Sequence, residues 1–173
     1  MKQLFILFLI IIFNGSIAVA KDTIYQHPAQ ISEVRMPQYS QASCKFSQTK
    51  TIPNSDAYIK SGGNFKFDIK NGVIFETLYP VKSTTAYTSD QSKRISDIII
   101  AISKKNYSYI NKNFEVYNLN NSGNWQIALK PKKDSKIHNV MDSITIHGSK
   151  YIDKIEINTL KSGSTKINFT ECR

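Results

Sequence analysis

The sequence has few of the residues that carry covalent chemistry or bind metals. Its 173 residues include two cysteines and three histidines, and His27, His138 and His147 lie far apart with no cysteine or carboxylate at metal-ligand spacing. No serine lies in a nucleophile-elbow pattern, and the glycines of Asn71-Gly72 and Ser162-Gly163 are typical of turns rather than of phosphate-binding loops. We therefore expect no metal, no cofactor, no catalytic residue and no enzymatic activity.

Long apolar runs are absent after the first twenty residues. The one run, Leu4 to Phe13, follows Lys2 and spans ten residues. A membrane-spanning helix needs roughly 20 apolar residues, whereas a basic start, a short apolar run and small residues up to Ala20 are typical of a cleavable secretory signal. We expect residues 1–20 to be a signal peptide and residues 21–173 to form one soluble domain outside the cytoplasm.

Acidic residues are also scarce. There are 13 of them against 23 lysines and arginines, and loss of Lys2 with the signal lowers the formal charge from +10 to +9. The lysines are scattered through expected strands and turns, with no arginine-rich run, so we expect no nucleic-acid partner. An anionic membrane surface, an acidic protein patch and simple solubilisation all remain compatible with this charge.

The two cysteines, Cys44 and Cys172, lie near opposite ends of the expected domain. An oxidising compartment would let them pair, and the chain-entropy model gives so long a loop roughly 4 to 5 kcal/mol of stabilisation. Two buried thiols are the alternative. We expect the disulfide.

Period-two alternation is the main structural signal. Apolar and polar residues alternate without error from Asn64 to Lys70, as in a strand with one buried face. Asn71-Gly72 follows at once as a two-residue hairpin turn, and Val73 to Tyr79 is the expected return strand. Seven further strands are predicted at Lys45 to Ile52, Lys82 to Thr88, Phe114 to Leu119, Trp125 to Lys130, Ser143 to His147, Lys154 to Asn158 and Thr165 to Thr170.

Two helices are predicted besides these strands. A short one is predicted within Ala29 to Met36, and isoleucines at helical spacing predict a longer one that follows the caps Ser89-Asp90 and ends near Lys104-Lys105. Nine short strands satisfy either a β-sandwich or an open barrel. The isoleucine-rich helix favours the second of these. The expected fold is therefore mainly β, an incomplete antiparallel β-barrel, or half-barrel, with helices lidding its apolar concave face.

The inward-facing apolar residues have two interpretations. They are either an ordinary packed core or, in part, a cavity for acyl chains, since small-molecule sites are concave and mainly apolar. Asp142, Asp153 and Glu156 could lie near one another on adjacent strands, which keeps a secreted hydrolase as a weaker alternative. An outer-membrane pore is disfavoured because Lys66 and Asp68 would then face lipid.

A set of landmarks in fixed order resembles a known family. They are FSQTK (46–50), SGGNF (61–65), GVIF (72–75), YP (79–80), FEV (114–116), NWQIALKPK (124–132), ITIHG (144–148) and STKINF (164–169). In this order they resemble the LolA-like proteins, which are periplasmic lipoprotein carriers of the Lol system. The resemblance covers roughly residues 44–169.

The resemblance implies a periplasmic, monomeric chaperone that shields the acyl chains of lipid-modified proteins. It would receive them from an inner-membrane Lol-type ABC exporter and pass them to an outer-membrane lipoprotein receptor. A LolA-like carrier of free lipid or glycolipid in another export system is the alternative.

The resemblance also implies roles for particular residues. It places Phe65, Phe67 and Phe75 in the lipid-binding cavity, and inward alternation adds Ile69, Trp125, Ile127 and Leu129. It makes Ile98, Ile99 and Ile102 lid residues, and Ile95 shares their helical spacing. One departure is that Ile69 and Lys70 occupy the region where such carriers place a latch arginine.

Overall fold

The computed structural model describes residues 23–87, 93–121 and 124–173. The expected signal peptide, the expected end of a strand at Thr88 and the expected caps Ser89-Asp90 lie outside these residues. Among the described residues, no helix is long and apolar enough to cross a membrane.

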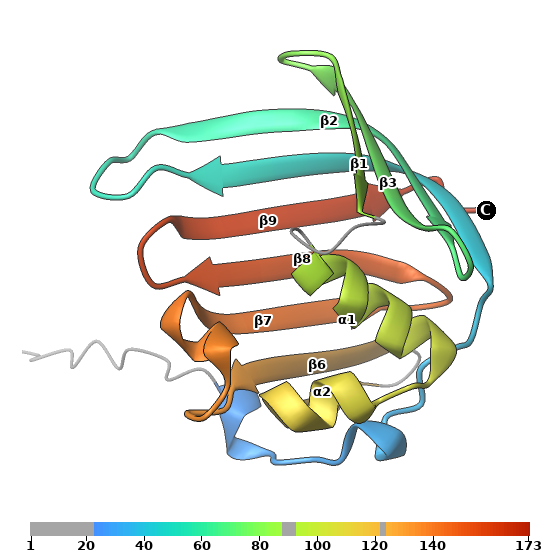
Figure 1. Ribbon diagram of the computed structural model, residues 1–173, viewed down its shortest axis with the longest axis vertical. Coiled ribbons are helices and arrows are strands. Elements are labelled where there is room, and N and C mark those ends of the chain that lie inside the picture. The colour runs from blue at the N-terminus through green and yellow to red at the C-terminus, as the bar shows by residue number, and fades with distance from the viewer. Residues whose placement is uncertain (1–22, 88–92, 122–123) are drawn as a thin grey trace, which may run out of the picture.

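Nine strands form one antiparallel sheet, which confirms the mainly β prediction and the strand count. They are β1 (Gln41–Thr51), β2 (Tyr58–Asp68), β3 (Gly72–Tyr79), β4 (Ser83–Tyr87), β5 (Phe114–Asn121), β6 (Asn124–Pro131), β7 (Met141–Gly148), β8 (Ile152–Thr159) and β9 (Gly163–Thr170). Their order across the sheet is β4-β3-β2-β1-β9-β8-β7-β6-β5. Since β4 and β5 are opposite edges, the sheet is open and forms an incomplete half-barrel (Figure 1).

One long-range pairing joins the two parts of the sheet. Every other neighbouring pair is consecutive in the sequence, whereas β1 pairs with β9, with Phe46 opposite Phe169. This pairing brings strands from the two ends of the described chain together at the centre of the sheet.

The turn between β2 and β3 differs from the prediction. Asp68 pairs with Gly72, so the turn consists of Ile69, Lys70 and Asn71 rather than of Asn71-Gly72 alone. The Asp68 carboxylate accepts hydrogen bonds from the Lys70 and Asn71 amides, both at 2.8 Å, which lowers its pKa. These bonds stop the strand at Asp68, and Gly72 begins β3 at φ 86°, a conformation that glycine adopts without strain.

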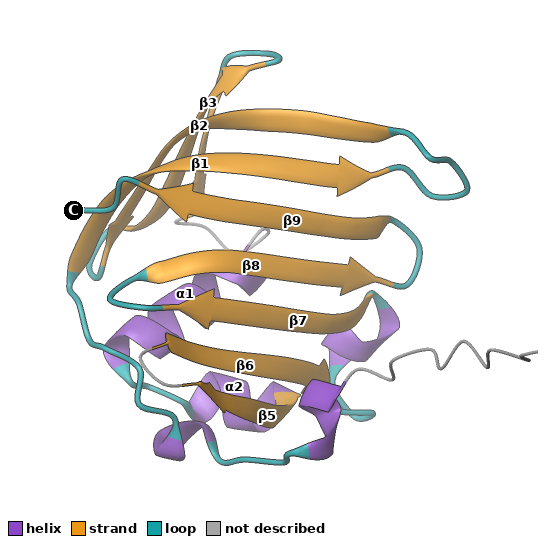
Figure 2. Cartoon of the chain, turned by 180° about the vertical axis from the view of Figure 1, so that it is seen from behind, coloured by secondary structure: helices purple, strands orange, loops and turns teal. Residues whose placement is uncertain are grey.

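Two α-helices cover the concave face of the sheet. Helix α1 (Lys93–Lys104) confirms the prediction of an isoleucine-rich helix and ends where Lys105 takes a positive φ and the Asn106 amide bonds the Ala101 carbonyl. Helix α2 (Ser108–Asn113) was not predicted, because six residues contain too little periodicity. Both helices lie on one side of the sheet in Figure 1, and Figure 2, seen from behind, shows α1 and α2 beyond the sheet.

The segment before β1 contains single turns of 3-10 helix rather than the predicted short helix. They are η1 (Thr23–Gln26) and η2 (Ile31–Glu33), and a third, η3 (Lys136–Asn139), precedes β7. Ile31 and Val34 are buried, as their shared face predicted. The same segment runs beside β5, where the Ala29 amide donates to the Val116 carbonyl at 2.9 Å.

Cys44 of β1 and Cys172, just after β9, form a disulfide. Of the two alternatives that the sequence left open, the structure has the cross-link rather than two thiols. Beside it, Ser43 and Arg173 exchange two backbone hydrogen bonds of 3.0 Å. The C-terminus is therefore tied to the strand at the centre of the sheet.

Candidate functional site

Four phenylalanines meet on the concave face where β1, β2, β3 and β9 lie side by side. We call Phe46, Phe65, Phe75 and Phe169 the aromatic cluster. Its ring centroids are 4.6 to 6.4 Å apart, and the Phe46–Phe75 and Phe65–Phe75 pairs meet edge to face. All four side chains are buried. Two of them, Phe65 and Phe75, are predicted cavity residues.

The other predicted residues on β2 and its turn lie at the border of this cluster. Phe67 is buried and meets the ring of Tyr39 edge to face, with centroids 5.6 Å apart. Ile69 belongs to the turn instead of the strand, yet it packs half-buried against the core. Lys70, next to it, is exposed, and its amide donates to the Asp68 carboxylate.

The predicted cavity residues of β6 lie elsewhere on the concave face. Strand β6 is the fourth strand beyond β1 in the sheet order. Ile127 and Leu129 are completely buried there. Trp125 lies against Gly148, where an added Cβ would meet its ring at 2.2 Å, and its indole N–H donates to the Ser149 carbonyl at 3.0 Å. This tryptophan holds the ends of β6 and β7 together.

The predicted lid residues belong to α1. Ile98, Ile99 and Ile102 are buried in the same hydrophobic cluster as the sheet residues, with Ile99 only 1% exposed. For Ile95 the structure describes only the helical backbone. The buried isoleucines form the stripe expected of an amphipathic helix that rests on an apolar face.

The face and its lid are closed against each other. Six predicted cavity residues have exposed fractions of 9% or less, and Ile98, Ile99 and Ile102 of α1 are 1% to 2% exposed. An acyl chain would reach this face only after α1 moved off the sheet. A lid over a binding face and a helix over an ordinary core both show closed packing of this kind. The assignment of the site therefore stays a prediction.

Two hydroxyl groups interrupt the apolar interior beneath α1. Ser103 of α1 is completely buried, and its hydroxyl has no hydrogen-bond partner among the described residues. It lies near the Tyr39 phenol but outside hydrogen-bonding geometry. Burial raises the pKa of Tyr39, and the nearby Ser103 hydroxyl and Ile152 backbone oppose part of that rise. A buried hydroxyl without a partner costs about 1 to 3 kcal/mol, so the closed lid is not fully satisfied.

The interior contains no charge within the described part of the chain. The buried polar residues there are Ser103, Ser135 and Ser143. Nor do the described histidines, cysteines and carboxylates form a group able to hold a metal ion. Such an interior can shelter apolar groups.

A separate groove lies outside the concave face. It has a volume of about 570 Å³ and is bordered by Pro28, Gln30, Tyr117 and Lys132, between the N-terminal segment and β5. The Lys132 ammonium donates to the Asn111 carbonyl of α2 at 2.7 Å, which holds this side chain at the border of the groove. None of the predicted cavity or lid residues borders this groove.

Sequence reasoning left Phe46, Phe169 and Tyr39 out of the candidate site. Phe46 and Phe169 show the inward alternation of their own strands, but their meeting depends on the pairing of β1 with β9. That pairing joins residues more than 100 positions apart and has no local signal. Tyr39 lies in an irregular segment, where no periodicity shows its direction.

Comparison with known proteins finds only distant likenesses. No protein-family model matches the sequence, and no curated protein matches it. Similar solved structures include a LolA superfamily protein from Nitrosomonas europaea, with a TM-score of 0.38 and 10% identity over 83% of this chain and 89% of that chain. A DUF1329 family protein from Desulfovibrio piger has a TM-score of 0.29 and 7% identity over 83% of this chain and 87% of that chain. Likenesses this distant carry no conclusion about function.

Proposed function

We propose that the protein is a carrier of acyl chains outside the cytoplasm, acting as a periplasmic chaperone for lipoproteins between the inner and outer membranes. The cargo would bind to the aromatic cluster beneath α1. The inner-membrane ABC exporter and the outer-membrane receptor would be its partners in loading and unloading.

One observation carries the proposal: a separate, short helix, rather than a second sheet, lies over the concave face of an open half-barrel (Figure 1). Helix α1 has twelve residues and rests on the sheet through a narrow stripe of isoleucines. A helix of this size can move aside without disturbing the hydrogen bonds of the sheet. The ordered landmarks of the sequence support the same proposal.

The energetics suit such a role. Each methylene removed from water is worth about 0.8 kcal/mol, so lipoprotein acyl chains need shelter to cross an aqueous compartment. The uncharged interior supplies that shelter.

The test is release of lipoproteins from membranes. The secreted protein is purified and incubated with spheroplasts that carry radiolabelled lipoproteins, and the soluble fraction is analysed. Intact labelled lipoprotein bound to the protein supports the proposal. Free lipid or glycolipid in the protein as isolated, without lipoprotein release, would support the alternative cargo. Neither lipoprotein nor lipid would refute a carrier function.

A pair of variants separates a lid from a core helix. Ile99→Asp places a carboxylate on the buried stripe of α1, whereas Asn106→Asp adds the same charge at an exposed position after the helix. We expect the first to abolish cargo binding while the circular dichroism of the sheet is kept, and the second to behave as wild type. Loss of the fold in Ile99→Asp would mean that α1 is part of the core.

A further inference from the structure

Exposed large apolar side chains gather at one end of the strands. The eight such residues in the described chain are Ile52, Tyr58, Ile59, Leu78, Tyr79, Val81, Val140 and Leu160, with exposed fractions from 39% to 73%. Five of them, which we call the apolar rim, flank the β1–β2 loop, the β8–β9 turn and the start of β7: Ile52, Tyr58, Ile59, Val140 and Leu160. Figures 1 and 2 both place these connections on the same side of the sheet.

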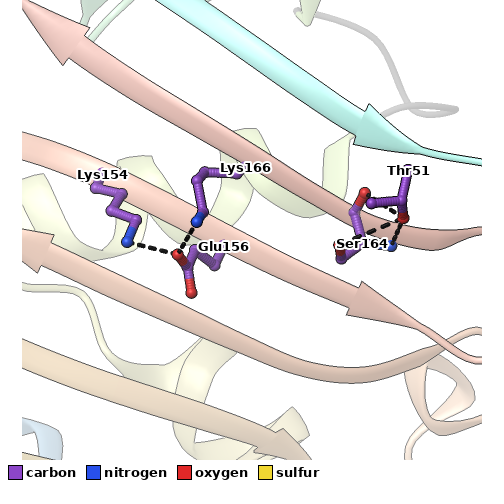
Figure 3. Close-up of polar contacts among 5 residues, drawn as sticks. All are labelled: Thr51, Lys154, Glu156, Ser164 and Lys166. Carbon is purple, nitrogen blue, oxygen red and sulfur yellow. Dashed lines mark hydrogen bonds and ion pairs between the residues drawn. The ribbon is translucent and has the colours of Figure 1, made fainter. Parts of the chain in front are cut away.

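Hydrogen bonds join the strands that carry the rim. Thr51 pairs with Tyr58, and its hydroxyl accepts a bond of 2.8 Å from the Ser164 amide at the start of β9 (Figure 3). The Leu160 amide donates to the Val140 carbonyl at 3.3 Å. The exposed side chains therefore project from a connected framework.

The opposite end of the strands has a different character. There the sheet ends in the disulfide of Cys44 and Cys172 and in the polar turn that follows Asp68. Its larger apolar residues, Ile69 and Tyr151, are half-buried against the core. Exposed apolar side chains thus gather at the rim and at the β3–β4 connection, where Leu78, Tyr79 and Val81 lie, and not at the end that carries the disulfide.

Lysines surround the rim. Lys50, Lys60 and Lys161 are exposed beside rim residues, and the Lys60 ammonium lies 5.1 Å from the centre of the Tyr58 ring. Asp56 is the acidic residue of the β1–β2 loop. A positive surface with apolar tips matches a negatively charged lipid interface, where lysines approach the headgroups and tyrosines prefer to lie.

We propose that the apolar rim docks the protein onto an anionic lipid bilayer. The rim residues project from separate connections, whereas a tight protein interface needs one continuous surface of complementary shape. Separate apolar side chains can each insert into the fluid surface of a bilayer. The apolar area that they bury and the positive charge of the lysines both add to the affinity for the bilayer. The proposal goes beyond acyl-chain carriage, because no rim residue is a predicted cavity or lid residue.

Vesicle co-sedimentation tests the rim. The protein is purified after secretion, its N-terminus is determined by mass spectrometry, and binding is measured to vesicles of phosphatidylcholine with and without phosphatidylglycerol. We expect binding only to the anionic vesicles, weakened by added salt. The double variant Ile59→Asp/Leu160→Asp should weaken it at least tenfold, and Lys50→Gln/Lys60→Gln by about fivefold for each lysine.

The matched control is Asn71→Asp, which adds a carboxylate at an exposed position of the opposite strand end. It should bind as wild type, and circular dichroism of all variants verifies their fold. Equal weakening by Asn71→Asp, or no binding by wild type, would overturn the proposal. A dimer in sedimentation equilibrium that Ile59→Asp/Leu160→Asp dissociates, without vesicle binding, would instead make the rim a contact between two copies. Because vesicles alone are the probe, failure here leaves the acyl-chain proposal standing.

Discussion

The concave face has two parts that differ in enclosure. Strands β6 to β8 present aliphatic side chains whose exposed fractions are 0% to 1%: Ile127, Leu129, Ile144, Ile146 and Ile155. The aromatic cluster on β1, β2, β3 and β9 is 5% to 9% exposed. The aromatic cluster is thus slightly less enclosed than these five aliphatic residues, and we expect a ligand to gain access there first.

The chemistry of the side chains explains the difference. Branched aliphatic residues on neighbouring strands interdigitate and leave little space. Edge-to-face rings keep their centroids 5.0 and 5.1 Å apart in the Phe46–Phe75 and Phe65–Phe75 pairs and offer flat apolar faces to a ligand. We expect the aliphatic part to provide stability and the aromatic part to provide binding.

The largest effect should come from the disulfide, which ties the aromatic part to the C-terminus. Replacing both cysteines, Cys44→Ala/Cys172→Ala, opens a loop of 128 residues and should lower the free energy of unfolding by about 4 to 5 kcal/mol. Urea unfolding measures this loss, and reduced wild-type protein is the control. A loss below about 1 kcal/mol would show that packing alone holds β1 in place.

Ile146→Ala probes the aliphatic part. Ile146 is completely buried, so removal of its side chain leaves a cavity and should cost about 3 kcal/mol. We expect Ile146→Ala to remain folded and to bind a fluorescent fatty acid with wild-type affinity. Weaker binding in proportion to the loss of stability would mean that the two parts act as one unit.

Phe75→Leu probes the aromatic part. The replacement keeps an apolar side chain, so we expect a loss of only about 1 kcal/mol in the free energy of unfolding. Fatty-acid affinity, measured by fluorescence titration, should fall at least tenfold because Phe75 contacts both Phe46 and Phe65. Unchanged affinity would place the ligand away from the aromatic cluster.

The smallest effect is expected on the convex side. Glu156 of β8 forms ion pairs with Lys154 and with Lys166 of β9, the latter at 3.2 Å (Figure 3). Burial tends to raise the pKa of Glu156, but hydrogen bonds and charge from both lysines outweigh it, so its pKa lies below the usual value. The pairs are partly exposed, and Glu156→Gln should cost about 0.5 kcal/mol at pH 7.

The lowered pKa of Glu156 determines how its contribution to stability changes with pH. A carboxyl whose pKa is lower in the folded state stabilises the protein above its unfolded-state pKa of about 4.3. That contribution disappears as the pH falls through the folded-state value. Urea unfolding of wild type and Glu156→Gln should therefore differ at pH 7 and coincide at the acid end of the titration. A difference that persists in acid would show an effect of side-chain packing.

Alternation along each strand made most of the sheet predictable. Phe65 and Phe67 point inward as predicted, because one face of β2 is buried. Local patterns failed where other contacts decide the structure. Ile69 looks like a strand residue, but the Asp68 carboxylate turns the chain there, and the six residues of α2 show almost no helical period.

The candidate site was less predictable than the sheet. Alternation tells which face a side chain takes, but not which strands are neighbours. The sequence therefore grouped Trp125 with Phe65, although their strands are far apart in the sheet order, and missed the contact of Phe169 with Phe65. Such groupings follow from pairing between distant segments, which no short pattern contains.

The N-terminal segment beside β5 has a consequence for self-association. Pro28 forms a bridge with Tyr117, and the Asn118 amide donates to the His27 carbonyl at 3.1 Å, so part of this sheet edge is already occupied. A strand edge is a template for pairing with another chain, and endless growth needs two free edges on every molecule. With part of the β5 edge occupied, pairing through β4 would favour two copies over continued growth into a fibre.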